Sequence, residues 1–425
     1  MIETERQARL KKSTSLHLAM ESTETLRQMG QFPDIPDSMA YFYDSCRSRY
    51  ANGTDFAQNG KKFIGTMCLQ VPDELIMAAG GVPVRLCSGA YAFDQVGGDF
   101  MPAKSCPMLR ATMGMMQVNT DILQDTLATV VIPTTCDQKR LSAEILKGMG
   151  YDVTLLEMPA SKESDDARIY WQESVKRFAL TVQKICGRKI TAKNLEAAIQ
   201  TKLEAGQLFR KLQELRSSSP PVIFGKDMWL VTNSYFFAEP GEWCRAVSDL
   251  IAELENRKPE WSSPLKHTAP RLLFTGSPPI FPNLKLPLLV EQAGAVIVAD
   301  ETCSSERLLH DAVVFDEKNL NDMVPAVADR YLKPCTCPCM TPNTDRIKRI
   351  LELVRINRVE GVVYQAFSGC LPYEMEQRAI GDKLNREKIP MLFVETDYSP
   401  EDQGQLSTRV EAFIESIKVK KRKQQ

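Results

Sequence analysis

The spacing of apolar residues divides the chain into two segments of alternating strands and helices, separated by a helical stretch. In the first segment, short runs rich in Val and Ile predict strands, and an apolar run with helical spacing predicts a helix. The strands are expected in KKFIGTMC, VPVRLC and TLATVVIPTTCD, and the helix in PDELIMAAGG.

The second segment repeats this alternation. Its expected helices are LKLPLLVEQAG and TDRIKRILELVRINRVE, and its expected strands are PRLLFTGS, AVIVADETC, GVVYQAFSGC and IPMLFVETD. Continuous β-branched runs are typical of strands that are buried on both faces, as in parallel sheets covered by helices. The sequence therefore predicts an α/β protein with two Rossmann-like parallel-sheet domains joined by a helical segment.

The stretch between the two segments has a helical pattern. Apolar positions from Trp171 to Leu215 recur every three or four residues, the run SSSPP breaks this pattern, and a further helix is expected at about 241–256. We therefore expect four parts, namely an N-terminal helical segment (1–55), a first α/β domain (56–160), a helical connecting region (161–268) and a second α/β domain (269–425).

The two α/β segments also share a weak internal repeat. ELIMAAGGVPVRLC resembles LLVEQAGAVIVADETC, and ATVVIPTTC resembles EGVVYQAFSGC. Two interpretations are open: both halves are versions of one βαβ unit, or any two parallel α/β domains look this similar at the level of single segments.

Composition narrows the class of protein. The chain is 43% hydrophobic and 25% charged with a net charge of −1, whereas nucleic-acid binding calls for a basic surface. The first twenty residues lack the apolar core of a secretory signal, and no stretch has the roughly 20 apolar residues of a membrane span. We expect a cytoplasmic protein, in which thiols stay reduced.

The twelve cysteines are then the main chemical signal. Four of them follow the carboxyl ends of expected strands, where open α/β sheets bind ligands: Cys68, Cys136, Cys303 and Cys370. Cys106 precedes an expected helix, where backbone N–H groups and the helix dipole favour a thiolate. The segment KPCTCPCM adds Cys335, Cys337 and Cys339 in one short loop.

The spacings predict three thiolates from each half of the chain. Cys68, Cys106 and Cys136 are spaced almost as Cys303, Cys339 and Cys370 are. In the internal repeat, however, Cys87 rather than Cys68 falls nearest to Cys303.

Three interpretations of these thiols are open at this point. Structural zinc usually takes four ligands from C-x₂₋₄-C pairs, and the sequence has no C-x-x-C pair. Iron–sulfur clusters are held by cysteine thiolates, and three thiolates on a cubane leave one iron free for a bridge, a substrate or water. The pattern favours iron–sulfur ligation over zinc and over inert thiols.

Several motifs together resemble those of the benzoyl-CoA reductase/2-hydroxyacyl-CoA dehydratase subunit family. They extend from about residue 60 to 415 and are GTMCLQVPDELIMAAGGVPVRL, SCPMLR, TTCDQKR, ADETC, YLKPCTCPCMTPNTDR, GVVYQAFSGCLPYEME and IPMLFVETDYSPEDQGQLSTRVEAF.

The resemblance implies a cofactor and partners. Dehydratase subunits of the family hold one [4Fe-4S] cluster with three cysteines, which match Cys68, Cys106 and Cys136. The additional cysteines make the chain most similar to the double-cubane cluster proteins. Those are homodimers with an [8Fe-9S] cluster, and they reduce small molecules such as acetylene with electrons from an ATP-hydrolysing [4Fe-4S] reductase.

The resemblance also implies the ligands, and it leaves one of them open. The expected set, in the cleft between the two α/β domains, is Cys68, Cys106, Cys136, Cys303, Cys339 and Cys370. Cys337 and then Cys335 are alternatives to Cys339, and a role for Cys87 is open. Catalytic residues are not predicted. The chain has no phosphate-binding G-x-x-x-x-G-K-[ST] motif, so we expect the partner to use the ATP.

Two other functions remain as alternatives. One is an (R)-2-hydroxyacyl-CoA dehydratase subunit with a single [4Fe-4S] cluster and a different partner subunit, which would leave the second-half cysteines without a use. The other is a binding protein without redox chemistry, holding structural zinc or idle thiols.

Overall fold

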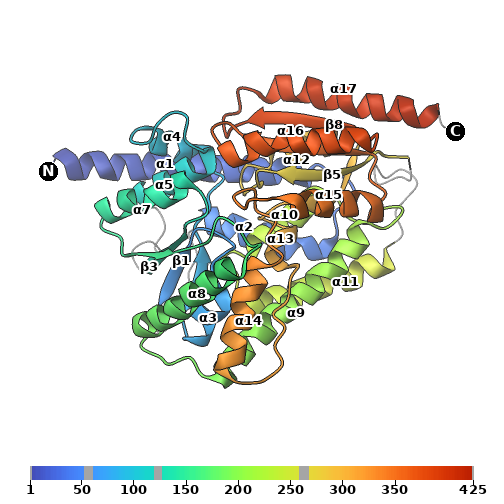
Figure 1. Cartoon of the computed structure of the whole chain (residues 1–425). Coiled ribbons are helices and arrows are strands. Elements are labelled where there is room, and N and C mark those ends of the chain that lie inside the picture. Colours follow the sequence, from blue (N-terminus) through green and yellow to red (C-terminus); the bar gives the residue numbers. More distant parts are fainter. Residues whose placement is uncertain (1, 52–60, 119–126, 258–267, 424–425) are drawn as a thin grey trace.

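The computed structural model describes residues 2–51, 61–118, 127–257 and 268–423. Two four-stranded parallel sheets, each with its own helices, form the two halves of the molecule (Figure 1). This arrangement confirms the predicted α/β class and the two Rossmann-like parallel sheets.

The first sheet has the strand order β2-β1-β3-β4, and all of its pairings are parallel. Its strands are β1 (Phe63–Thr66), β2 (Val82–Arg85), β3 (Leu127–Pro133) and β4 (Val153–Leu156). The helices that connect or follow them are α3 (Asp73–Ala78), α4 (Tyr91–Gly98), α5 (Pro107–Val118) and α7 (Asp137–Gly148).

The second sheet has the order β6-β5-β7-β8, again with parallel pairings throughout. Its strands are β5 (Arg271–Gly276), β6 (Val296–Glu301), β7 (Gly361–Phe367) and β8 (Met391–Thr396). Strands β6 and β7 are buried along their whole length, as the β-branched runs near their starts predict. The helices in this part of the sequence are α12 (Lys285–Gln292), α13 (Glu306–Leu309), α14 (Leu320–Leu332), α15 (Thr344–Ile356), α16 (Leu371–Arg386) and α17 (Gln403–Arg422).

The two sheets share one topology. In each, the second strand lies on one side of the first, and the third and fourth strands lie on the other side. The order in which strands are added to the sheet therefore reverses between β1 and β3, and again between β5 and β7. In open α/β sheets, ligands bind in the crevice beyond the strand ends at such a point. The matching order fits the internal repeat, which pairs β2 with β6 and β3 with β7.

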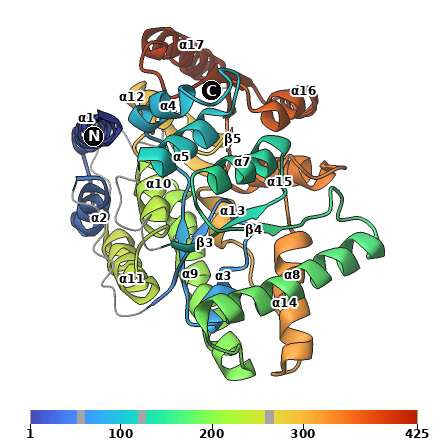
Figure 2. The ribbon, with the colours of Figure 1, turned by 90° about the vertical axis from the view of Figure 1, so that its left-hand side faces the viewer.

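The helices between the sheets divide between two cores. They are α8 (Asp165–Cys186), α9 (Ala192–Arg216), α10 (Gly225–Ser234) and α11 (Pro240–Asn256). Helix α8 packs in one apolar core with the first sheet and with α14, and Trp171 donates a hydrogen bond of 2.7 Å to the Ala328 carbonyl. Figure 2 shows α14 beside α8 and α9, although α14 belongs to the second half of the sequence. Helices α10 and α11 instead pack in the core of the second sheet.

The N-terminal helices bridge the two halves. They are α1 (Ile2–Gly30), the short 3₁₀ helix η1 (Asp37–Met39) and α2 (Ala40–Ala51). Helix α1 packs against α4 and α5, and α2 packs against α10. None of the helices in the described ranges has both the length and the apolar character that a bilayer crossing needs.

Several elements were not predicted from the sequence, and three of them have a clear physical reason. Strand β4 lies at the edge of its sheet and is only partly buried, so its apolar signal is weak. Helix α10 is buried on all sides and shows no amphipathic period. Helix α14 contains Pro325, a residue that normally interrupts helices. The domain boundaries stated above remain predictions.

Candidate metal centre

Nine of the twelve cysteines line one cavity of about 390 Å³ between the two halves. They are Cys68, Cys87, Cys106, Cys136, Cys303, Cys335, Cys337, Cys339 and Cys370. The other three lie elsewhere: Cys46 and Cys244 are buried in the core of the second sheet, and Cys186 packs against the core of the first. All six expected ligands and all three alternatives are thus brought to one place.

The first sheet contributes its thiols from strand ends and from one helix start. Cys68 and Cys87 follow β1 and β2 closely, and Cys136 is the N-cap residue of α7 just beyond β3. Cys106 directly precedes α5, and its own N–H donates to Gln138 Oε1 at 2.8 Å. Parallel strands end at one edge of their sheet, so these thiols face a common space.

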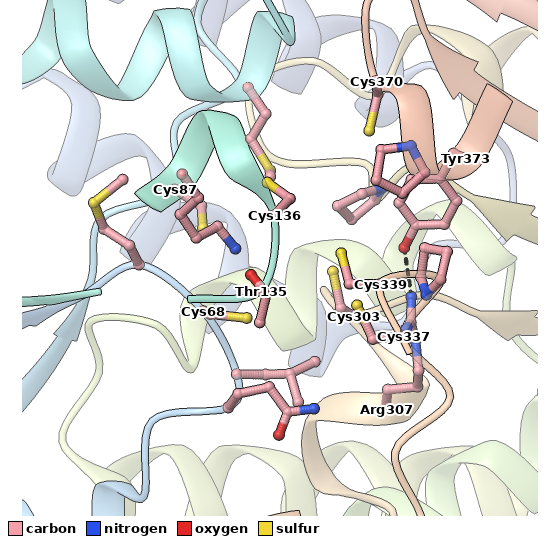
Figure 3. Close-up of a pocket in the computed structure, with 18 of the residues that line it drawn as sticks. Cys68, Cys87, Thr135, Cys136, Cys303, Arg307, Cys337, Cys339, Cys370 and Tyr373 are labelled. Carbon is pink, nitrogen blue, oxygen red and sulfur yellow. Dashed lines mark hydrogen bonds between the residues drawn. The ribbon is translucent and has the colours of Figure 1, made fainter. Parts of the chain in front are cut away.

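The second sheet contributes its thiols in the same way. Cys303 follows β6, Cys370 is the N-cap residue of α16 beyond β7, and the three loop cysteines lie between α14 and α15. Figure 3 shows Cys68, Cys87 and Cys136 facing Cys303, Cys337 and Cys339 across the cavity.

Thiols of the two halves influence each other's ionisation across the cavity. Cys106 pairs with Cys370, and Cys339 pairs with both Cys136 and Cys337. The two halves are therefore close enough for their sulfurs to interact directly, and the N-terminal and C-terminal trios of the sequence prediction form one group.

These interactions lower the pKa of some thiols and raise the pKa of others. Interaction with the neighbouring Cys339 side chain lowers the pKa of Cys136 to about 6 and the pKa of Cys337 to about 6. Interaction with the Cys370 side chain likewise lowers the pKa of Cys106. The partners, Cys339 and Cys370, have raised pKa values for the same reason. Thiolate is the form that binds metal, so the cavity already stabilises charged sulfur.

Burial acts in the opposite direction on other thiols. It raises the pKa of Cys303 to about 12 and of Cys335 to about 12, because a charged sulfur there loses its hydration. The amide nitrogen of Gln70 donates a hydrogen bond of 2.7 Å to Cys335 Sγ, so this thiol already has a protein partner.

Hydrogen bonds from both halves fix the loop that carries the three cysteines. Thr336 donates through Oγ1 to Glu301 Oε1 at 2.7 Å, and Lys162 Nζ lies 2.8 Å from the Cys335 carbonyl oxygen. Glu301 is fully buried and also forms an ion pair with buried Arg346. The loop is thus held against the cavity by a buried ionic network rather than left to move freely.

Three cationic side chains also line the cavity, Lys139 from the first half and Arg307 and Arg330 from the second. Burial lowers the pKa of Lys139, but the neighbouring sulfurs, above all Cys68 and Cys136, outweigh this effect and leave the pKa above its usual range. Arg307 is 8% exposed, and its Nη2 donates a hydrogen bond of 2.6 Å to the hydroxyl of Tyr373 (Figure 3). Its Nε lies 3.2 Å from Glu301 Oε1.

The donor set fits a polynuclear cluster better than a single ion. Within the described ranges, no three His, Cys, Asp or Glu side chains converge as ligands around one metal ion. The sulfurs instead surround a volume of about 390 Å³, whereas a site for one water needs only about 10–15 Å³. Soft thiolates that surround a volume of this size match iron–sulfur ligation.

Arg307 and Tyr373 were missed by the sequence analysis. Both follow a strand-end cysteine by one helical turn, since Arg307 comes four residues after Cys303 and Tyr373 three residues after Cys370. A search for polar residues one turn beyond each candidate ligand would have found them.

The fold and the cavity define a class of protein with two parallel α/β sheets and a thiol-lined site between them. The sequence model of the family described as 2-hydroxyglutaryl-CoA dehydratase, D-component, matches residues 68–417. The chain belongs to this family, which confirms the resemblance to benzoyl-CoA reductase and 2-hydroxyacyl-CoA dehydratase subunits.

Curated relatives align along nearly their whole length. A candidate dehydratase subunit of Escherichia coli (strain K12), YjiM, is 29% identical over 92% of this chain and 100% of its own. A benzoyl-CoA reductase subunit of Thauera aromatica is 25% identical over 85% and 92%. The beta subunit of (R)-2-hydroxyglutaryl-CoA dehydratase of Acidaminococcus fermentans is 23% identical over 85% and 94%. The chain is thus a member of an enzyme family whose named relatives include both reductase and dehydratase subunits.

Proposed function

We propose that this chain is a low-potential iron–sulfur reductase for small molecules. Six thiolates, those of Cys68, Cys106, Cys136, Cys303, Cys339 and Cys370, would hold an [8Fe-9S] double-cubane cluster. One observation carries the proposal: thiols from both halves, among them all six of these cysteines, line one cavity. A cluster confined to the first half would leave the second-half thiols in the same cavity without a role.

The proposal includes two partners. An ATP-hydrolysing [4Fe-4S] reductase would supply the electrons, since the sequence has no phosphate-binding loop of its own. A second copy of the chain would form the functional homodimer, and we place this assembly in the cytoplasm. When bound, the cluster would supply electrons at low potential.

The residues of the chain would provide the surroundings for that chemistry. Buried walls keep water away from the reacting molecule and strengthen electrostatic interactions in the cavity. Arg307 and Tyr373 form a polar edge on the second-half wall, where the guanidinium donates to the tyrosine oxygen and Glu301 holds the guanidinium in place. This edge would orient a substrate that carries a polar group.

The second candidate is one subunit of an (R)-2-hydroxyacyl-CoA dehydratase with a single [4Fe-4S] cluster. The observation in its favour is that relatives aligned over 85% of this chain include the beta subunit of (R)-2-hydroxyglutaryl-CoA dehydratase. In that case Cys68, Cys106 and Cys136 would hold the cluster, and the partner would be a different subunit.

Iron and sulfide analysis of anaerobically purified protein tests the proposal. A double-cubane protein should contain about eight irons and about nine sulfides per chain, a dehydratase subunit about four of each, and a protein without a cluster none. About four irons per chain would overturn the proposal in favour of the dehydratase.

A variant at the cross-half contact adds a second test. Cys370→Ala should lose a large part of the iron, whereas Cys186→Ala, outside the cavity, should keep all of it. Full iron content in Cys370→Ala would remove this residue from the ligand set.

A further inference from the structure

The ammonium group of Lys139 has no protein partner within the described ranges. Its side chain lines the cavity, and the ammonium takes part in no hydrogen bond or ion pair with any residue of those ranges. The charges that act on it are the sulfurs of Cys68, Cys87, Cys136 and Cys339. Leaving a cation unpaired in partly desolvated surroundings is costly, so its counter-charge must come from what the cavity holds.

Arg307 occupies a comparable place on the opposite half. The sulfurs of Cys303 and Cys337 act on its charge, and it is almost fully buried. Its ion-pair partner Glu301 is shared with Arg346, so this carboxylate does not neutralise Arg307 alone.

The two cations have equivalent positions relative to the strand-end thiols. Lys139 follows Cys136 by three residues on the first turn of α7, and Arg307 follows Cys303 by four residues on α13. Each half therefore presents thiols and at least one cation to the same cavity. Arg330 of the second half also lines it, but its guanidinium donates to the carbonyl oxygens of Leu308 and Asp311.

We propose that Lys139 and Arg307 are positioning residues that balance the charge of the bound cluster and raise its reduction potential. The inference rests on the proposed function. Each electron taken up from the partner reductase adds one negative charge to the contents of the cavity, and no bond is made or broken. A fixed cation nearby lowers the free energy of the reduced form more than that of the oxidised form, and the effect is large where water is excluded.

Lys139 is the better residue to test because its removal leaves no partner behind, whereas loss of Arg307 would leave Glu301 short of a counter-ion. The informative replacements are Lys139→Gln, which removes the charge, and Lys139→Arg, which keeps it. Lys147→Gln is the matched control, since Lys147 lies on the same helix, half-exposed and paired with Glu144 at 2.8 Å.

The measurement is the midpoint potential of the loaded protein, followed by electron paramagnetic resonance during a redox titration. In Lys139→Gln the ratio of reduced to oxidised protein at a fixed potential should fall at least about tenfold, a shift of about 59 mV to more negative values for one electron. Lys139→Arg and Lys147→Gln should stay near the wild-type value. An unchanged potential in an iron-replete Lys139→Gln protein would overturn the inference.

Loss of the cluster from a variant is also informative. If Lys139→Gln fails to retain iron and Lys139→Arg retains it, the result supports the charge role, because charge is what distinguishes the two. If both lose iron, charge is not the reason for the lysine, and the inference is wrong. Wild-type protein without iron would contradict the proposed function itself, whereas iron-replete wild-type protein with an insensitive potential contradicts only this inference.

Discussion

Cys106 and Cys370 come from different sheets, yet they line the same cavity at the boundary between the two halves, and each shifts the pKa of the other. The side chain of Gln138 also links backbone groups of the two loops that carry these cysteines. Gln138 accepts a hydrogen bond from the Cys106 N–H at 2.8 Å and donates one to the Gly369 carbonyl at 3.0 Å. The side chain of Gln138 therefore joins the Cys106 loop to the Cys370 loop.

Replacing Gln138 by Ala should weaken that connection. Two hydrogen bonds in a half-buried setting are lost, so we expect a decrease of about 1–3 kcal/mol in the free energy of unfolding. We also expect iron to be lost faster when the protein is exposed to a chelator. Urea unfolding and the rate of iron release measure the two effects. Gln117→Ala, at an exposed position of α5, should change neither. Wild-type stability in Gln138→Ala would show that other contacts hold the loops.

Gly369 should tolerate no side chain. Its φ is +82°, and an added Cβ would lie 2.1 Å from the carbonyl oxygen of Lys104. A left-handed conformation costs an L-residue about 1–2 kcal/mol, and the clash adds to this cost by pushing apart the loops of Cys106 and Cys370. We expect Gly369→Ala to be destabilised by at least about 2 kcal/mol and to bind less iron.

Gly148→Ala is the control for this substitution. Gly148 ends α7 with an ordinary φ and has no atom within 4 Å of an added Cβ. This variant should be as stable as the wild type or slightly more so. If thermal unfolding and iron content of the two variants agreed, the close approach at Gly369 would not matter.

The loop cysteines should differ in their importance for iron. Cys339 interacts with Cys136 of the first half, whereas Cys335 is hydrogen-bonded to Gln70 and is 7% exposed. We expect Cys339→Ala to lose a large part of the iron and Cys335→Ala to keep most of it. Iron analysis of the two purified variants checks this. The reverse result would make Cys335 the sixth ligand, and equal retention would point to Cys337.

Glu21 should give the stability a pH dependence. Burial raises its pKa from 4.5 to about 7, although the Tyr91 and Ala92 N–H groups donate to its carboxylate. The folded protein then holds more protons than the unfolded chain between these pH values, so stability is highest at low pH and falls as the pH rises through this window. The full effect is about 3 kcal/mol.

Unfolding by urea at pH 5 and at pH 8 measures this effect. Glu21→Gln should show a smaller loss of stability between the two pH values than the wild type. Glu24→Gln, on the same helix, is the control. A hydrogen bond with Arg27 lowers the pKa of Glu24 to about 2, so its contribution is lost only as the pH falls below about 4.5. An identical change in wild type and Glu21→Gln would contradict the prediction.

The sequence by itself determined the class of fold and the chemical character of the site. β-Branched runs such as those in β6 and β7 are typical of strands buried on both faces, as in a parallel sheet between helices. Thiols just beyond strand ends must gather at the edge of their sheet, because parallel strands all end there. Both conclusions follow from the local pattern of residues, so the sequence alone was sufficient to reach them.

Only the tertiary structure decided how the two halves meet. The packing of α14 against α8, and the contact of Gly369 with residues 104–105, join segments that are far apart in the sequence. No local pattern encodes such contacts, because they depend on the relative position of two folded units. Lys139 and Arg307 are likewise brought together only by the tertiary structure, in which both side chains line one cavity.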